Sequence, residues 1–98
     1  MNQTRQLSED SKKLKKQVET TQADFVLTEV SASTTFAQVA LDADDPEKRE
    51  RNRKNARKGY DTARRFSHTP ALRGPGLQEF NMGMARLEKM LRRLGEDV

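Results

Sequence analysis

The chain has 98 residues and no cysteine, which excludes disulfide bonds and thiolate metal sites. Tryptophan is also absent, and the aromatic residues are one tyrosine and four phenylalanines. Apolar residues form only short runs such as Phe25-Val26-Leu27, whereas a helix that spans a membrane needs about 20 of them. Residues 1–10 lack the apolar centre of a signal peptide. These absences predict a cytoplasmic protein with no membrane segment.

Apolar residues make up 33% of the chain and charged residues 35%, and the mean hydropathy is −1.01. A core can form from this composition only if the apolar side chains gather on a few faces. The length allows one domain. We therefore predict a single helical domain over residues 21–98. Residues 1–20 are predicted to be a leader that is either flexible or a continuation of the first helix.

Neither proline nor glycine occurs before residue 45, so the first part of the chain can form a long helix. Residues 22–42 show two apolar stripes when they are projected at about 100° per residue. The first stripe consists of Val26, Val30, Ala37, Ala40 and Leu41, and the second of Phe25, Ala32, Phe36 and Val39. A helix with two apolar faces normally lies between two neighbours, so we expect a different helix on each stripe, the third helix lying on the second stripe.

Asp45-Pro46 marks the start of a second helix, predicted over residues 46–66. The Asp45 carboxylate can accept hydrogen bonds from free amides of the first turn, and Pro46 suits the first helical position. Because the connection to the first helix is short, the two helices should form an antiparallel hairpin. Pairing positions across the turn places Ser33 near Ala56, where small side chains would allow a close approach.

Residues 75–94 predict a third helix, which follows a break rich in proline and glycine. Its large apolar side chains recur at alternating spacings of three and four, which makes a heptad seam of Leu77, Phe80, Met84, Leu87, Leu91 and Leu94. The seam can pack within the chain, which we favour because a hairpin alone would have a thin core. Alternatively, it forms a protein-interaction site that binds another protein or a second copy of the chain.

The segment 46–66 is strongly basic, with nine lysines and arginines against three acids, or +6 in a chain of +4. Six side chains are candidates for phosphate contacts in a nucleic-acid complex, namely Arg53, Lys54, Arg57, Lys58, Arg64 and Arg65. Their spread around the helix instead favours a solvated outer face. Tyr60 should point to the core rather than stack on bases. Acids also stand four residues before bases, as Asp61 does before Arg65, and this spacing stabilises an exposed helix.

Little in the sequence predicts catalysis. His68 is the only histidine, and no cysteine or second histidine can complete a metal site with it. The hydroxyl groups of residues 31–35 have no base beside them, so they would be poor nucleophiles. We therefore predict a protein that is not an enzyme and that binds no metal or cofactor.

Two segments resemble known helical proteins. The pattern Ala56-x3-Tyr60-x2-Ala63 before Pro70 is similar to the second helix of a tetratricopeptide repeat, although the proline of that family would fall at His68. This resemblance implies a helical hairpin used for protein contact. Residues 45–63, D-P-E-K-R-E-R-N-R-K-N-A-R-K-G-Y-D-T-A, look like a segment of small bacterial helical proteins, a resemblance that brings no established activity with it.

The sequence thus predicts an all-α protein in which an antiparallel helical hairpin is joined by a third helix. Its predicted function is that of a small non-catalytic protein-interaction or adaptor protein, which binds another protein or itself. The alternative is a nucleic-acid-binding protein that uses the basic helix 46–66.

Overall fold

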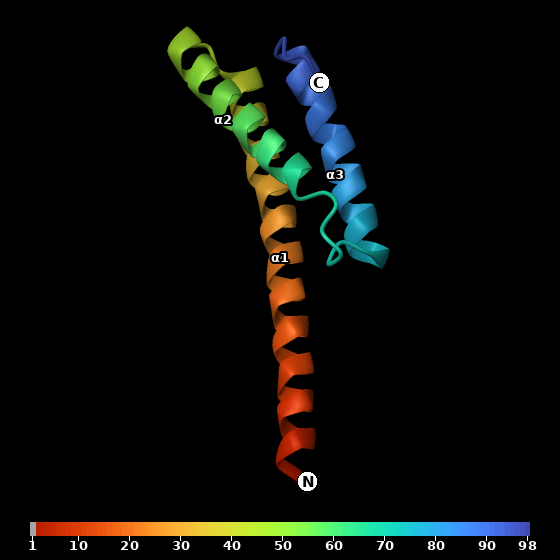
Figure 1. Ribbon diagram of the computed structural model, residues 1–98. Coiled ribbons are helices and arrows are strands. Elements are labelled where there is room, and N and C mark those ends of the chain that lie inside the picture. Colours follow the sequence, from red (N-terminus) through yellow and green to blue (C-terminus); the bar gives the residue numbers. More distant parts are fainter. Residues whose placement is uncertain (1) are drawn as a thin grey trace.

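The structure is a computed structural model that describes the backbone of residues 2–98 and the side chains from Glu9 onward. It consists of three helices, α1 (Asn2–Asp42), α2 (Pro46–Arg65) and α3 (Gly74–Arg93), with no strand in these residues. Figure 1 shows that α2 runs back along α1 and that α3 then runs in the same direction as α1. The predicted all-α arrangement of a hairpin and a third helix is confirmed.

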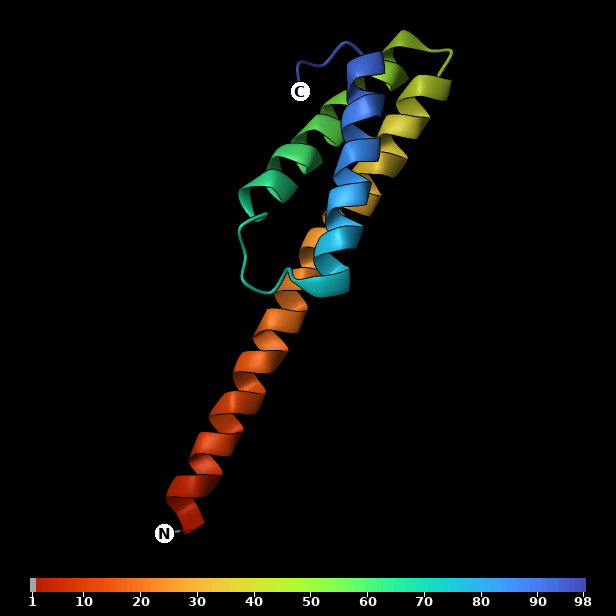
Figure 2. The same ribbon diagram turned by 90° about the vertical axis from the view of Figure 1, so that its right-hand side faces the viewer.

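Helix α1 has 41 residues, about twice the length of its neighbours, and the molecule measures 67 × 22 × 17 Å. In Figures 1 and 2 the N-terminal half of α1 lies clear of α2 and α3. Every described side chain up to Val18 is exposed, and we call residues 2–18 the projecting segment. Of the two predictions for the leader, the structure shows the continuing helix. No helix of the described residues has a stretch long and apolar enough to cross a bilayer.

The turn before α2 has the predicted capping geometry. The Asp45 carboxylate accepts a hydrogen bond from the backbone amide of Glu47 (Oδ1···N, 3.1 Å), and Pro46 is the first helical residue. The cap satisfies one of the amides that have no partner inside the helix, and Glu47 complements the positive end of the helix dipole. The short connection then leads directly into the antiparallel pairing of α1 with α2.

Helices α1 and α2 approach closely at Gly59. A β-carbon at Gly59 would lie 1.8 Å from Ser33 Oγ and 3.1 Å from Ser33 Cβ. The small residue predicted opposite Ser33 was Ala56, which is also fully buried. Gly59, whose backbone meets Ser33 most closely, lies one turn further along α2 and was not singled out.

Helix α3 packs against the first apolar stripe of α1, not against the second as predicted. A β-carbon at Gly83 would lie 2.8 Å from Val30 Cγ1, so the backbone of α3 passes close to that stripe. Val26 and Val30 are buried, whereas Phe25 and Phe36 of the second stripe stay exposed. Because Gly83 has no side chain, α3 can share one broad apolar face of α1 with α2. The second stripe is left without a covering helix.

The heptad seam of α3 lies inside the core, where five of its six members are buried, namely Phe80, Met84, Leu87, Leu91 and Leu94. They form one apolar cluster with residues of α1 and α2 and with Leu72 of the α2–α3 loop. Leu77 alone remains exposed. Buried side chains cannot contact another protein while the helices stay packed. The seam is therefore used within the chain, and the interaction site predicted from it is corrected.

Helix α3 ends in a Schellman motif at Gly95, where φ is 90° and a side chain would be strained. The amide of Gly95 donates to the carbonyl oxygen of Arg92 (3.0 Å), and the amide of Glu96 donates to that of Leu91 (2.9 Å). This turn directs Glu96 back toward α2.

Candidate interaction surface

An exposed apolar stripe runs along α1 from the projecting segment onto the packed part of the helix. We define the α1 stripe as Leu14, Val18, Phe25, Ala32 and Phe36. The exposed fractions of the four large side chains, in that order, are 62%, 49%, 46% and 37%, and Ala32 is exposed as well. Spacings of four and seven keep all five within about 40° around the helix. At 1.5 Å per residue the stripe is about 33 Å long.

The α1 stripe lies beside the core face rather than opposite it, with its centre about 120° from the line of Val26 and Val30. The end of α2 borders it. The ring of Phe25 meets that of Phe66 edge to face, with centroids 5.7 Å apart and planes at 89°. A contact of this kind contributes about 0.5–1.5 kcal/mol and helps to hold Phe25 in place. Phe66 is itself 46% exposed, so it widens the apolar surface.

Only part of this surface was predicted from the sequence. Phe25, Ala32 and Phe36 were predicted to form an apolar face, but that face was assigned to α3. Leu14 and Val18 were missed because residues 1–20 were treated as separate from the helix that follows. The seven-residue spacing from Val18 to Phe25 and on to Ala32 is the signal that joins the two parts.

Three of the six basic residues predicted to contact nucleic acid pair with acids. Lys54 does so loosely, with Nζ 3.9 Å from Glu50 Oε1, and Arg53 and Arg57 do so closely. Arg53 pairs with Glu50 and with Glu96, the latter at 2.5 Å (Nη1···Oε2). Arg57 Nε donates to Asp61 (3.1 Å), and Arg57 Nη1 lies 3.6 Å from Glu96 Oε1. These hydrogen bonds raise the pKa of both guanidinium groups, the largest cause being Glu50 at Arg53 and Asp61 at Arg57. Both positive charges are therefore paired with carboxylates of the same chain.

Lys54 and the remaining three candidates, Lys58, Arg64 and Arg65, are exposed on the outer side of α2. All six except Arg64 line one shallow groove, and Asp61 and Glu96 line it too. The carboxylate of Asp61 pairs with Arg57 rather than with Arg65 as predicted. The groove is a mixed surface in which acids stand among the bases.

Tyr60 points into the core, as predicted, and is 2% exposed. Its hydroxyl donates a hydrogen bond to Glu88 of α3 (Oη···Oε1, 3.0 Å). Burial raises the pKa of Tyr60, and the hydrogen bond to Glu88 raises it further. The side chain thus links α2 to α3 and is not available for stacking on a base.

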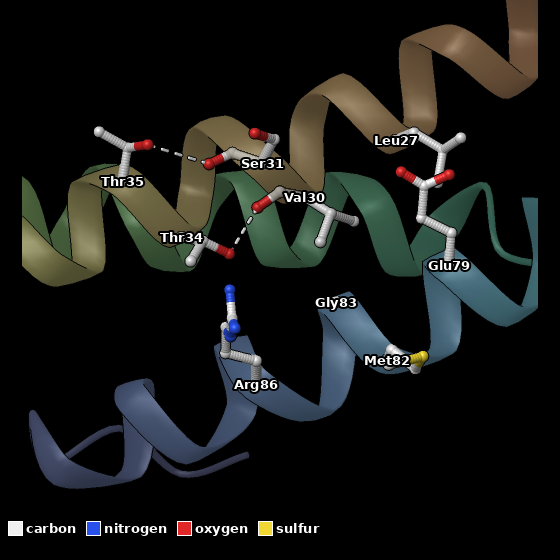
Figure 3. Close-up of a pocket in the computed structure, with 9 residues that line it drawn as sticks. All are labelled: Leu27, Val30, Ser31, Thr34, Thr35, Glu79, Met82, Gly83 and Arg86. Carbon is white, nitrogen blue, oxygen red and sulfur yellow. Dashed lines mark hydrogen bonds between the residues drawn. The ribbon is translucent and has the colours of Figure 1, made fainter.

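A hollow of about 530 Å³ lies between α1 and α3 (Figure 3). It is lined by Leu27, Val30, Ser31, Thr34 and Thr35 of α1 and by Glu79, Met82, Gly83 and Arg86 of α3. The Thr34 hydroxyl donates to the carbonyl oxygen of Val30 (2.8 Å), and the Thr35 hydroxyl donates to that of Ser31 (3.2 Å). Both hydroxyls are therefore engaged with their own helix. No histidine stands among these lining residues, so they offer no neutral base to activate a hydroxyl.

Among the residues whose side chains the structure describes, no three histidine, aspartate or glutamate side chains gather in a way that could hold a metal ion. His68 lies exposed in the loop between α2 and α3. Comparison with protein-family models, with curated proteins and with solved structures finds no match. The resemblances to tetratricopeptide repeats and to small bacterial helical proteins stay predictions. The geometry of the α1 stripe is what remains to indicate a function.

Proposed function

We propose that this chain is a small non-catalytic protein-interaction protein and that the α1 stripe is its binding surface. The observation that carries the proposal is a row of exposed apolar side chains along one side of a helix that extends past the rest of the molecule (Figure 1). The heptad seam of α3 cannot supply the surface, because its side chains fill the core.

The energetics of burial support this surface. Single exposed apolar residues are normal on a soluble protein, but a contiguous row of them marks an interaction site. Covering apolar surface stabilises a complex by about 25 cal/mol per Å², so a fully covered leucine or valine contributes about 1.5–3 kcal/mol. The four large members of the α1 stripe would therefore dominate the affinity.

The projecting segment supports the proposal in a second way. An isolated helix of this length is marginal in water, because most helical stability in proteins comes from the packing of an apolar face. The described side chains of the segment from Glu9 to Val18 are all exposed. A partner that lies along Leu14 and Val18 would supply the missing packing and would stabilise the helix of the segment.

Replacing Val18 with glutamate should abolish the capture of partner proteins without changing the fold. Val18 is exposed and lies outside the core, so the thermal unfolding of α2 and α3 should be unchanged. A charge buried without a partner in an interface should weaken binding by roughly a hundredfold. The measurement is capture from an extract of the source organism by the immobilised chain, with mass spectrometry of the bound proteins.

The matched control is Thr20→Glu. It adds the same charge two positions along, which places it on another side of α1, away from the α1 stripe. This variant should capture the same proteins as the parent chain. The proposal fails if Val18→Glu captures them equally well, or if the parent chain captures none.

Nucleic-acid binding is a second candidate function, supported by the five basic residues that share one groove on α2. It predicts binding to any duplex, with an affinity that falls steeply as salt rises because counterions are released. The double variant Lys54→Glu/Lys58→Glu should then bind at least about tenfold more weakly at low salt. A gel-shift titration at two salt concentrations measures this. Absence of binding at low salt would exclude the candidate.

A further inference from the structure

The exposed side of α1 carries a seven-residue repeat that includes most of the α1 stripe and extends it. One row of the repeat consists of Val18, Phe25, Ala32 and Val39, and the other of Leu14, Thr21, Thr28 and Thr35. All are exposed except Val39, which is half-buried. Two rows offset by three and four residues occupy the a and d positions of a coiled coil. We call these eight residues the α1 seam.

The α1 seam differs from a solvated helix face. It contains no charged residue, although 35% of the chain is charged. On a straight helix, residues with a strict seven-residue period drift by about 20° per repeat. Two helices keep such residues in contact by winding around each other, so this period is typical of a coiled coil. Apart from Val39, helices α2 and α3 leave the seam uncovered, because the side of α1 that they bury is that of Val26 and Val30.

We propose that the α1 seam binds a second copy of this chain in antiparallel orientation, an inference that rests on the proposed function. In the register that we infer, Val18 of each copy lies opposite Thr21 of the other, and Leu14 lies opposite Phe25. These central layers join one row of the seam to the other, and beyond them Thr28 lies opposite Ser11 of the other copy. The side chains of the central layers can then interdigitate.

This register gives each projecting segment a surface to lie on. Leu14 and Val18, which are 62% and 49% exposed in the monomer, are placed against Phe25 and Thr21 of the other copy. Phe66 borders this surface through its contact with Phe25, so it is covered as well. The α2 and α3 helices of the two copies stay at opposite ends of the pair and do not collide.

The residues that flank the α1 seam are compatible with the antiparallel orientation. In the inferred register Lys15 faces Gln22 of the other copy, and Asp24 faces Gln17, so like charges do not meet. A parallel pair in register would place Asp24 against Glu29, which repel each other, and Asp10 against Lys15, which attract each other. The orientation is therefore decided by the experiment below.

The size of the contact indicates a reversible dimer. Where the described side chains of both copies meet, over residues 9–30, the contact is about 32 Å long and about 10 Å wide. That part would bury on the order of 600 Å² in total, which is the size of a weak and transient contact. We therefore expect monomer and dimer to exchange at micromolar concentrations.

Sedimentation equilibrium of the whole chain should show a monomer–dimer equilibrium in the micromolar range. Val18→Glu should raise the midpoint concentration at least about tenfold, and Thr20→Glu should not change it. Circular dichroism of each variant shows whether the monomer still folds.

A parent chain that stays monomeric at all concentrations overturns the inference. If that monomer still captures another protein through Val18, the proposed function stands and only the second copy is excluded. If it captures none but binds phosphatidylglycerol vesicles, both proposals fail.

Cross-linking tests the orientation. The chain has no cysteine, so introduced cysteines are the only thiols. When Leu14→Cys and Phe25→Cys chains are mixed under mild oxidation, the disulfide between the two variants should form faster than either variant links to itself. Faster linking of each variant to itself would show parallel pairing and would overturn the antiparallel arrangement.

Discussion

Replacing Gly59 with leucine should prevent the α1–α2 hairpin from folding, and replacing it with alanine should destabilise the chain. A β-carbon there would lie 1.8 Å from the hydroxyl oxygen of Ser33, a residue that is only 1% exposed. Overpacking of this kind costs about 1–3 kcal/mol for one carbon, and the better helix propensity of alanine returns at most about 1 kcal/mol. We expect Gly59→Ala to lower the free energy of unfolding by about 1–2 kcal/mol, measured by chemical denaturation.

The double variant Gly59→Ala/Ser33→Ala separates the clash from other effects. Without the Ser33 hydroxyl the nearest atom to the new β-carbon is the β-carbon of residue 33, at 3.1 Å, so the double variant should recover part of the lost stability. Gly76→Ala in α3 is the control, because a β-carbon there meets no atom within 4 Å. If Gly59→Ala is as stable as Gly76→Ala, the close approach of α1 and α2 lies elsewhere.

Replacing Leu87 with alanine should lower the free energy of unfolding by about 3–4 kcal/mol. Leu87 has no exposed surface and lies in the apolar cluster that joins the three helices. Truncating it removes buried apolar surface and leaves a cavity. Since small domains are stable by only about 5–15 kcal/mol, we expect a large fall in the melting temperature, measured by circular dichroism.

Met82→Ala is the matched control on the same helix, because Met82 is 75% exposed and its loss should change the unfolding free energy by less than about 0.5 kcal/mol. The comparison also decides between the two uses predicted for the heptad seam of α3. If Leu87→Ala unfolded like the parent chain but failed to associate, the seam would be an interface and not core.

The helices could be predicted from sequence because their signals are local. Asp45 and Pro46 set the start of α2, and Gly95 sets the end of α3, each through backbone geometry that a few neighbouring residues determine. The predicted limits of α2 and α3 are therefore correct to within one residue.

The packing could not be predicted in the same way. Phe25 and Phe36 are the largest apolar residues of α1, which suggested that a helix would cover them. The positions of α2 and α3 depend instead on where backbones can come close, and that is decided by Gly59 and Gly83. The sequence around a glycine inside a helix does not indicate which distant residue will pack against it.

The candidate site was found only in part for a related reason. The charges of Arg53 and Arg57 are evident in the sequence, but their partner Glu96 lies about forty residues away and reaches them through the turn at Gly95. The spacing of the apolar residues in the sequence also indicates the apolar side of α1. Whether it stays uncovered depends on where α3 packs, and only the structure shows that.

The length of α1 has a consequence for spacing. In the proposed antiparallel pair, the packed part of each copy is centred near Ala32, and the two centres would lie about 38 Å apart at 1.5 Å per residue. An insertion or deletion in the projecting segment would keep the two rows of the α1 seam aligned only if it changed the length by seven residues or a multiple of seven. Each such change would move the two packed parts by about 10 Å. In the proposed pair, the length of the projecting segment would therefore set the distance between the two packed parts, and that distance could change only in steps of one heptad.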